Sequence, residues 1–193
     1  IFASSCAYPV KGFHYLLEAF GQIVKTYPDA TLAVPGKSFL TANRLRRTNY
    51  QKYLADLAEQ YGVEDKIEFL GSLSGEEMKQ AFLDANVFVL PSTIENSPNS
   101  LGEAMLLGLP CVASAAGGIP DMLQSGVQGM LYGAAGDDAA LSAAILQVLA
   151  LPDHGTALGT AAQIRARVTH DAAKNTAQMI EIYRKVLQRE GTL

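Results

Sequence analysis

Two polar stretches of the sequence, residues 6–12 and residues 91–100, have the composition of ligand-binding loops. Each follows a short apolar run. The first stretch contains Lys11, whose ammonium group carries a full positive charge, and the second contains Glu95 among hydroxyl and amide side chains. A lysine in such surroundings is suited to binding a phosphate group.

The second stretch also predicts the start of a helix. Ser97 followed by Pro98 is typical of an N-cap and a first helical residue, and Gly108 with Pro110 ends the helix after about three turns. The N-terminus of a helix offers unpaired N–H groups and the positive end of the helix dipole. Together with Lys11, this helix favours a phosphate-bearing ligand.

Alternating strands and helices bring the two stretches together. The candidate strands are residues 1–5, 31–34, 67–70, 87–90, 111–114 and 130–132, and the candidate helices are residues 13–24, 45–61, 75–85, 97–108, 137–149, 155–168 and 171–189. This order predicts an α/β fold: a doubly wound, Rossmann-like, parallel six-stranded sheet with helices on both faces and an all-helical C-terminal segment. Such a sheet reverses between its first and fourth strands, and ligands bind at that point, where both polar stretches begin.

Several other chemistries are excluded by missing patterns. The sequence has no G-x-G-x-x-G after the first strand, no G-x-x-x-x-G-K-[ST] and no G-x-S-x-G. His14, His154 and His170 are scattered, and no carboxylate cluster has metal-binding spacing, so no metal site is expected. From the residues alone, the prediction stops at a phosphate-bearing ligand.

Composition narrows the class of protein further. The 193 residues carry a net charge of −4, which gives no basic footprint for nucleic acid. Cys6 and Cys111 lie far apart and suggest neither a disulfide framework nor a zinc site. The sequence has no apolar run long enough to span a membrane and no signal peptide, so a cytoplasmic location is expected. The chain starts inside a candidate strand without an initiator Met, which suggests a segment of a longer protein.

The run of residues 95–105, followed by residues 108–110 and 117–121, resembles the donor-site signature of family 4 (group 1) glycosyltransferases. Glu95 and Glu103 have that family's E-x7-E spacing. Residues 11–12, 69–71 and 182–183 also fit, so the resemblance covers nearly the whole chain as the C-terminal half of a GT-B enzyme.

The resemblance implies a domain that binds a nucleotide-diphosphate sugar as donor substrate, with no cofactor. The parent enzyme would transfer a hexosyl group with retention and without a metal, and this fragment alone would be nearly inactive. The acceptor, a sugar or a lipid-linked sugar, would be held by an N-terminal half. By resemblance, Lys11 holds the diphosphate and Glu95 contacts the sugar hydroxyls, and these two are the expected catalytic residues. The other donor-binding residues would be Gly36, Lys37, Gly71, Asn96, Ser97, Asn99, Ser100, Leu101 and, for the ribose, Glu103.

One departure from the family pattern concerns the phosphate clamp. The family usually has Arg five positions before its Lys, and this sequence has Cys6 there. Either Arg44, Arg46 or Arg47 replaces it, or the diphosphate is held less tightly. The departure also supports a rival interpretation, a degenerate GT-B domain that binds a nucleotide or a partner without catalysis. A second rival, a GT-B epimerase, is disfavoured because neither crevice loop contains His.

Three further points have more than one interpretation. Ser100 and Glu103 also fit a capping box, in which Glu103 only satisfies a backbone N–H. The Gly117-Gly118 pair either turns the chain or approaches the ligand closely. The last helix, in residues 171–193, is expected to pack back toward the N-terminal half while residues 1–170 form the donor-binding domain; contact with a membrane surface is the alternative for its apolar side.

Overall fold

The computed structural model describes residues 1–41, 43–133 and 136–189, and it contains a single layer of parallel strands. The strands are β1 (Leu32–Val34), β2 (Ile67–Phe69), β3 (Phe88–Leu90), β4 (Cys111–Ser114) and β5 (Met130–Tyr132). β1 pairs with β2, β3 with β4, and β4 with β5, all in parallel. The predicted α/β fold with a parallel sheet is confirmed.

The N-terminal segment joins the two groups of strands. Phe2 forms parallel bridges to both Ala33 of β1 and Phe88 of β3, and its N–H donates to the carbonyl of Val87 at 2.9 Å. The sheet order is therefore β2, β1, the N-terminal segment, β3, β4, β5, which reverses at the predicted place.

The prediction of a strand over residues 1–5 is too long. Only Phe2 is bridged to both neighbours. The hydroxyl of Ser5 instead accepts a hydrogen bond from the N–H of Ala7 at 3.2 Å, a local side-chain contact that competes with sheet pairing.

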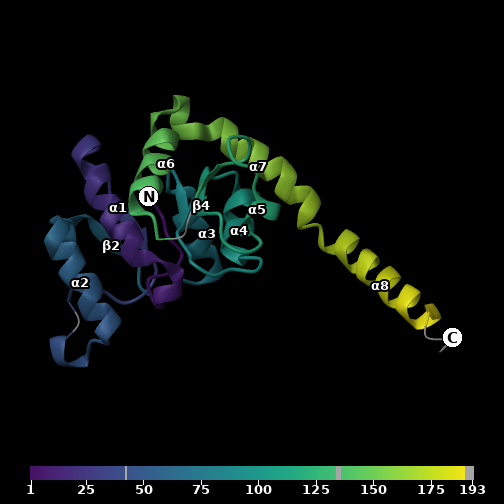
Figure 1. Cartoon of the computed structure of the whole chain (residues 1–193), viewed down its shortest axis with the longest axis horizontal. Helices are drawn as coiled ribbons and strands as arrows, with labels where there is room; N and C mark the ends of the chain where they lie inside the picture. The colour runs from purple at the N-terminus through teal and green to yellow at the C-terminus, as the bar shows by residue number, and fades with distance from the viewer. Residues whose placement is uncertain (42, 134–135, 190–193) are drawn as a thin grey trace.

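Helices cover both faces of the sheet (Figure 1). One face packs against α1 (Phe13–Thr26), α2 (Asn49–Tyr61) and α6 (Asp138–Ala150), and the other against α3 (Gly75–Leu83), α4 (Asn99–Leu107) and α7 (Thr156–Thr169). The short elements are α5 (Ile119–Met122), η1 (Pro9–Lys11), η2 (Arg44–Arg46), η3 (Glu64–Lys66) and η4 (Pro152–Gly155).

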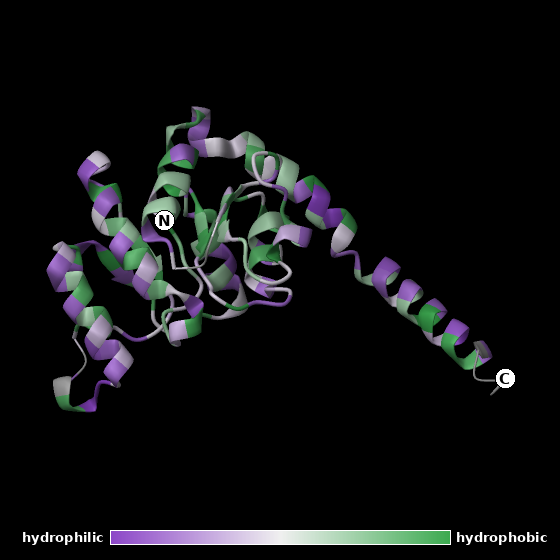
Figure 2. Ribbon diagram, viewed as in Figure 1, coloured by the Kyte–Doolittle hydropathy of each residue, from purple (hydrophilic) through white to green (hydrophobic). Residues whose placement is uncertain are grey.

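Successive residues of β3 show why the strands read as continuous apolar runs. Val89 belongs to the core beneath α1, whereas Phe88 and Leu90 belong to the core beneath α4. A strand buried on both faces needs apolar residues at every position. In Figure 2 the strands and the inward helix faces are accordingly the hydrophobic part of the body.

The helix predicted over residues 45–61 begins four residues later. Thr48 is its N-cap, and Thr48 and Gln51 form a capping box that fixes the start at Asn49. Arg44–Arg46 form a separate 3-10 turn, in which the side chain of Asn43 accepts a hydrogen bond from the N–H of Leu45. The helix predicted over residues 75–85 ends at Leu83.

The start of α4 also differs from the prediction. Pro98, and not Ser97, is the N-cap, with extended backbone angles, and the helix begins at Asn99. Ser97 makes a tertiary contact instead, since its hydroxyl lies 3.7 Å from the sulfur of Met122. Ser100 is inside the helix, so the capping-box interpretation of Glu103 is wrong, because an N-cap must have non-helical angles.

The last helix, α8 (Ala172–Arg189), extends away from the body of the protein (Figure 1). Its residues 172–188 are all exposed. Apolar and polar side chains alternate along it (Figure 2). Within the described residues, no helix is long and apolar enough to cross a membrane.

Candidate functional site

The two polar loops meet at the carboxyl ends of the strands. The ammonium of Lys11 lies 2.6 Å from Oε1 of Glu95, and the two residues are 84 positions apart in the chain. The side chain of Lys11 is 36% exposed and that of Glu95 only 10%. An ion pair of this kind, at the switch point of a doubly wound sheet, has the geometry expected for recognition of a charged ligand.

The loop backbones are tied together beneath this ion pair. Both the N–H and the hydroxyl of Thr93 donate to the carbonyl of Val10, the N–H at 2.9 Å. Gly12 has a φ of 69°, and a Cβ on it would lie 2.0 Å from the carbonyl oxygen of Pro91. Only glycine permits both the left-handed angle and this approach, so Gly12 lets the lysine loop lie against the end of β3.

A third loop, after β4, packs on the same place. A Cβ on Gly117 would lie 1.7 Å from the carbonyl oxygen of Glu95, and one on Gly118 would lie 2.0 Å from that of Asn96. The Gly117-Gly118 pair therefore does make a close approach, and its neighbour is the glutamate loop of the same chain. The two glycines fix the backbone on either side of Glu95.

The first turn of α4 borders the ion pair. Asn96 and Ser97 precede the helix and are exposed, as is Asn99 at its start, while Ser100 is half-buried. The Ser97 hydroxyl contacts the sulfur of Met122. Leu101 is different: its side chain is fully buried in the core, and its N–H donates to the carbonyl of Pro98 at 3.2 Å.

A second cluster lies at the ends of β1 and β2. Gly36 and Gly71 exchange two backbone hydrogen bonds, at 2.7 and 3.2 Å, and Lys37 is exposed beside them. A Cβ on Gly36 would lie 4.0 Å from the sulfur of Cys6. Cys6 thus connects the two clusters, and together they form a row of loops along one edge of the sheet.

Glu103 lies further along α4. It is exposed and lines a groove of about 330 Å3 between α3 and α4, together with Gly75 and Met78 of α3. Glu103 therefore borders the outer side of α4, one helical turn beyond its N-terminus.

The loop of residues 6–12 contains no arginine, so no residue of this loop replaces the arginine that the family usually has at the position of Cys6. Burial raises the pKa of the Cys6 thiol, so the group stays neutral at physiological pH. The guanidinium of Arg47 donates to the carbonyl of Leu40, within its own loop. Figure 1 shows the turn of residues 44–46 at the outer end of that loop, beyond α2.

His14, which the sequence did not indicate as a site residue, lies two residues after the loop that contains Lys11. Nδ1 of His14, in the first turn of α1, is 3.1 Å from the hydroxyl of Tyr50, and burial lowers the pKa of the imidazole. Its ring also contacts Tyr15, with centroids 3.9 Å apart. The feature of the sequence that could have identified His14 is its position two residues after Gly12.

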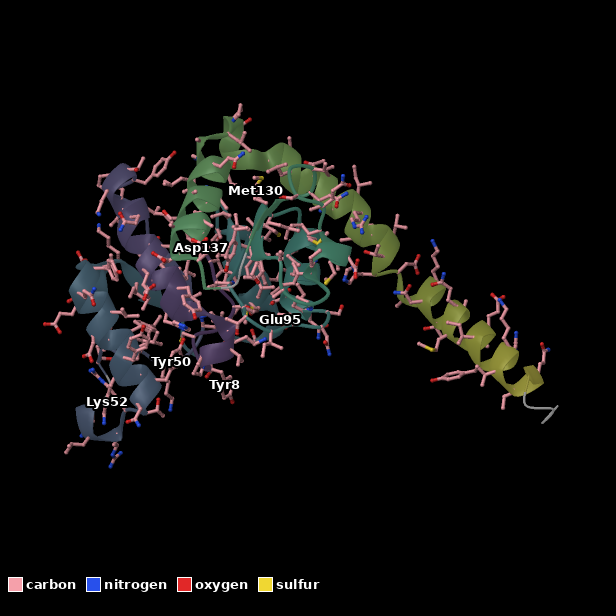
Figure 3. All side chains as sticks on the ribbon, viewed as in Figure 1. Tyr8, Tyr50, Lys52, Glu95, Met130 and Asp137 are labelled. Carbon is pink, nitrogen blue, oxygen red and sulfur yellow. The ribbon has the colours of Figure 1, made fainter. Side chains whose placement is uncertain are left out.

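Larger hollows lie elsewhere among the described residues. Two cavities of about 340 and 350 Å3 flank Ile1, and Thr31 and Asn86 line both. The hollow beside Lys11 measures only about 10 Å3. The Lys11 hollow lies at the carboxyl ends of the strands, the edge at which ligands of open α/β sheets bind. Figure 3 shows Tyr8 and Glu95 on this side of the molecule.

The part of the chain that the structure describes contains no group of three His, Cys, Asp or Glu side chains that could hold a metal ion. The charged groups that the described residues place along this row of loops include Lys11, Glu95 and Lys37, beside the N-terminus of α4.

A doubly wound parallel sheet with charged loops at its switch point defines a Rossmann-like α/β domain. The family model for glycosyl transferases group 1 matches residues 1–165. This chain belongs to the group 1 glycosyltransferases, and its fold is that of the GT-B enzymes.

Individual relatives agree with this assignment. A D-inositol 3-phosphate glycosyltransferase of Corynebacterium urealyticum is 31% identical over 179 residues, which are 92% of this chain and 41% of the relative. The structure of sucrose-phosphate synthase from Thermosynechococcus elongatus has a TM-score of 0.82 and 27% identity, and covers 97% of this chain and 45% of that one. That of Anabaena Alr3699/HepE in complex with UDP has a TM-score of 0.81 and 26% identity, with 95% and 48% covered. The chain spans less than half the length of each of these proteins.

Proposed function

We propose that this chain is the donor-binding domain of a glycosyltransferase that transfers a hexosyl group from a nucleotide-diphosphate sugar, with retention and without a metal ion. The observation that carries the proposal is the 2.6 Å contact between Lys11 and Glu95 at the switch point of the sheet. The UDP complex of a relative that is 26% identical supports a nucleotide-sugar donor.

The proposed roles follow from the charges. As the bond between the sugar and the diphosphate breaks, negative charge grows on the diphosphate. The ammonium of Lys11 and the N-terminus of α4 stabilise that charge, and no metal is needed for it. The carboxylate of Glu95 accepts hydrogen bonds from the sugar hydroxyls, and its contact with Lys11 holds both groups beside the reacting bond.

The acceptor is assigned to another part of a longer protein. The names of two relatives point to different acceptors or products, inositol phosphate and sucrose phosphate, although both are similar to this chain. A half that is similar in enzymes with such different names is better suited to binding the donor than to binding the acceptor. We therefore expect the 193-residue chain to bind the donor and to transfer it hardly at all. The acceptor would be a sugar or a lipid-linked sugar.

The last helix is assigned to the interface with that other part. α8 exposes an apolar series that includes Ile180, Tyr183 and Leu187, at 45%, 62% and 42% exposure. An apolar stripe of this length needs a partner surface. We assign residues 1–170 to the donor-binding domain and residues 171–193 to a segment that packs on the acceptor-binding half through α8; residues 190–193 of that segment lie outside the described residues.

Calorimetric titration of the chain with UDP, GDP and ADP, each with and without its sugar, tests donor binding. We expect at least one to bind, and the Lys11→Met variant to bind it about ten- to a hundredfold more weakly, because a charged hydrogen bond contributes about 1.5–3 kcal/mol. Lys25→Met is the matched control, since Lys25 is exposed at the other end of α1, where it contacts Gln22.

The outcomes separate the parts of the proposal. Absence of binding by every nucleotide at millimolar concentration contradicts the donor site, and equal loss in both lysine variants contradicts the role of Lys11. A chelator should leave the affinity unchanged; a loss would contradict the metal-free part. The anomeric configuration of the product made by a full-length protein, read by NMR, tests retention. Donor binding without any transfer by that full-length protein would favour a degenerate domain.

A further inference from the structure

A buried hydroxyl group, that of Ser92, lies two residues after the end of β3. Ser92 is completely buried, and among the described residues its Oγ has no hydrogen-bond partner. The carbonyl of the same residue accepts a hydrogen bond from the hydroxyl of Ser114 at 2.5 Å, so the backbone of Ser92 is fixed. A buried hydroxyl without a partner is unfavourable, and native proteins contain few of them.

Ser92 lines the small cavity beside the lysine loop. Residues 3–5, residues 89–92 and Lys11 form its walls, and its volume is about 10 Å3. That volume is about the minimum in which a single water molecule fits, and it is far too small for a phosphate group. The wall also offers hydroxyl groups, so the cavity is polar enough to hold a water.

Lys11, which lines the cavity, has N–H donors beyond the one that contacts Glu95. An ammonium group carries three N–H donors, and the structure assigns one of them to Glu95. A water in the cavity could accept a second N–H from Lys11 and exchange a hydrogen bond with Ser92. Such a bridge restricts the flexible lysine side chain, whose free rotation would otherwise have to be lost on ligand binding.

We propose that this cavity is a binding site for one ordered water molecule, and that Ser92 is a positioning residue which acts on Lys11 through that water. Ser92 does not touch the donor. Its effect on donor binding rests on the proposed function; the water site itself does not.

The variant Ser92→Ala distinguishes a hydroxyl that binds a bridging water from a hydroxyl without a partner, because the melting temperature should respond differently in the two cases. If the hydroxyl is unpaired, its removal relieves the cost of burying it, and the melting temperature rises. If it binds a water that also contacts Lys11, the melting temperature stays the same or falls, and the NMR signal of the Lys11 ammonium moves. Ser142→Ala, at a buried serine of α6, is the control and should leave that signal unchanged.

We expect Ser92→Ala to move the Lys11 signal, to leave or lower the melting temperature, and to weaken UDP binding about tenfold. A raised melting temperature with an unmoved signal would overturn the proposal. A second measurement uses the unaltered protein, so it does not depend on folding of the variant: a long-lived water should give cross-relaxation to the Lys11 ammonium, and its absence counts against the site. If the unaltered protein binds no nucleotide, the proposed function fails while both NMR results still decide the water site.

Discussion

The Cα of Gly117 lies directly against the main-chain carbonyl of Glu95, so closely that a Cβ there would come within 1.7 Å of the oxygen. The loop after β4 thus determines where the backbone of the glutamate loop lies. No side chain could take this place, because the obstructing atom is backbone and has no rotamer to change.

Gly117→Ala should therefore lower the free energy of unfolding by more than the backbone strain alone would. The control is Gly126→Ala: Gly126 also has a positive φ, 76° against 53° at Gly117, but nothing lies within 4 Å of its Cβ position. We expect the control to lower the free energy of unfolding by about 1–2 kcal/mol, the cost of the left-handed angle. Gly117→Ala should lower it by more and should also weaken nucleotide binding, as urea unfolding and calorimetry will show. Equal costs at the two positions would mean that the Gly117 contact does not matter.

The carboxylate of Glu95 should strengthen binding of the sugar but weaken binding of the nucleotide diphosphate. Its carboxylate adds negative charge near the proposed diphosphate position, but it also accepts hydrogen bonds from the proposed sugar. Glu95→Gln should therefore leave the affinity for UDP unchanged or raise it, and should reduce the advantage of UDP-sugar over UDP. Titration of both ligands into both proteins measures that ratio. An equal loss for the two ligands would instead indicate that the variant has disturbed the loop.

The sequence could predict the strand order, which brings the loops of the site together. Short apolar runs between turn residues located β1 to β5 within a residue, because strands buried on both faces must be apolar throughout. The switch-point rule then brought Lys11 and Glu95 to the same edge. It could not predict their direct contact, since that depends on the approach of Gly12 to Pro91, which is a matter of ångströms.

The errors arise at residues whose side chains make contacts other than the expected ones, one tertiary and one local. Ser97 was predicted to cap α4, but its hydroxyl is directed to Met122, a residue from another loop. Residues 4 and 5 were predicted to continue the first strand, but a side-chain hydrogen bond between Ser5 and Ala7 turns the chain away. Local propensity does not include such partners.

The contact between Gly102 and His170 predicts a non-additive pair of substitutions. A Cβ on Gly102 would lie 2.5 Å from Nε2 of His170, whose Nδ1 lies 2.9 Å from the hydroxyl of Thr169. With His170→Ala in place, Gly102→Ala should raise the free energy of unfolding by about 1 kcal/mol, the helix propensity of alanine over glycine. In the unaltered protein the displaced imidazole should cancel that gain. A double-mutant cycle by urea unfolding measures the coupling, and strictly additive effects would show that the ring moves aside at no cost.

His14 should make the stability depend on pH below about 6.5. Burial lowers the pKa of this imidazole in the folded protein, while the unfolded chain retains the ordinary value near 6.5. As the pH falls through that value, the unfolded chain takes up a proton that the folded protein does not, so the free energy of unfolding decreases. His14→Gln keeps a polar group that can reach the hydroxyl of Tyr50 and has no titrating group. Both proteins share every other titrating residue, so the difference between their unfolding free energies, measured by urea from pH 7.5 to 5.5, isolates His14. As the pH falls, the free energy of unfolding should decrease less for the variant than for the unaltered protein. If the two free energies depend on pH in the same way, His14 gains its proton as easily in the folded protein as in the unfolded chain.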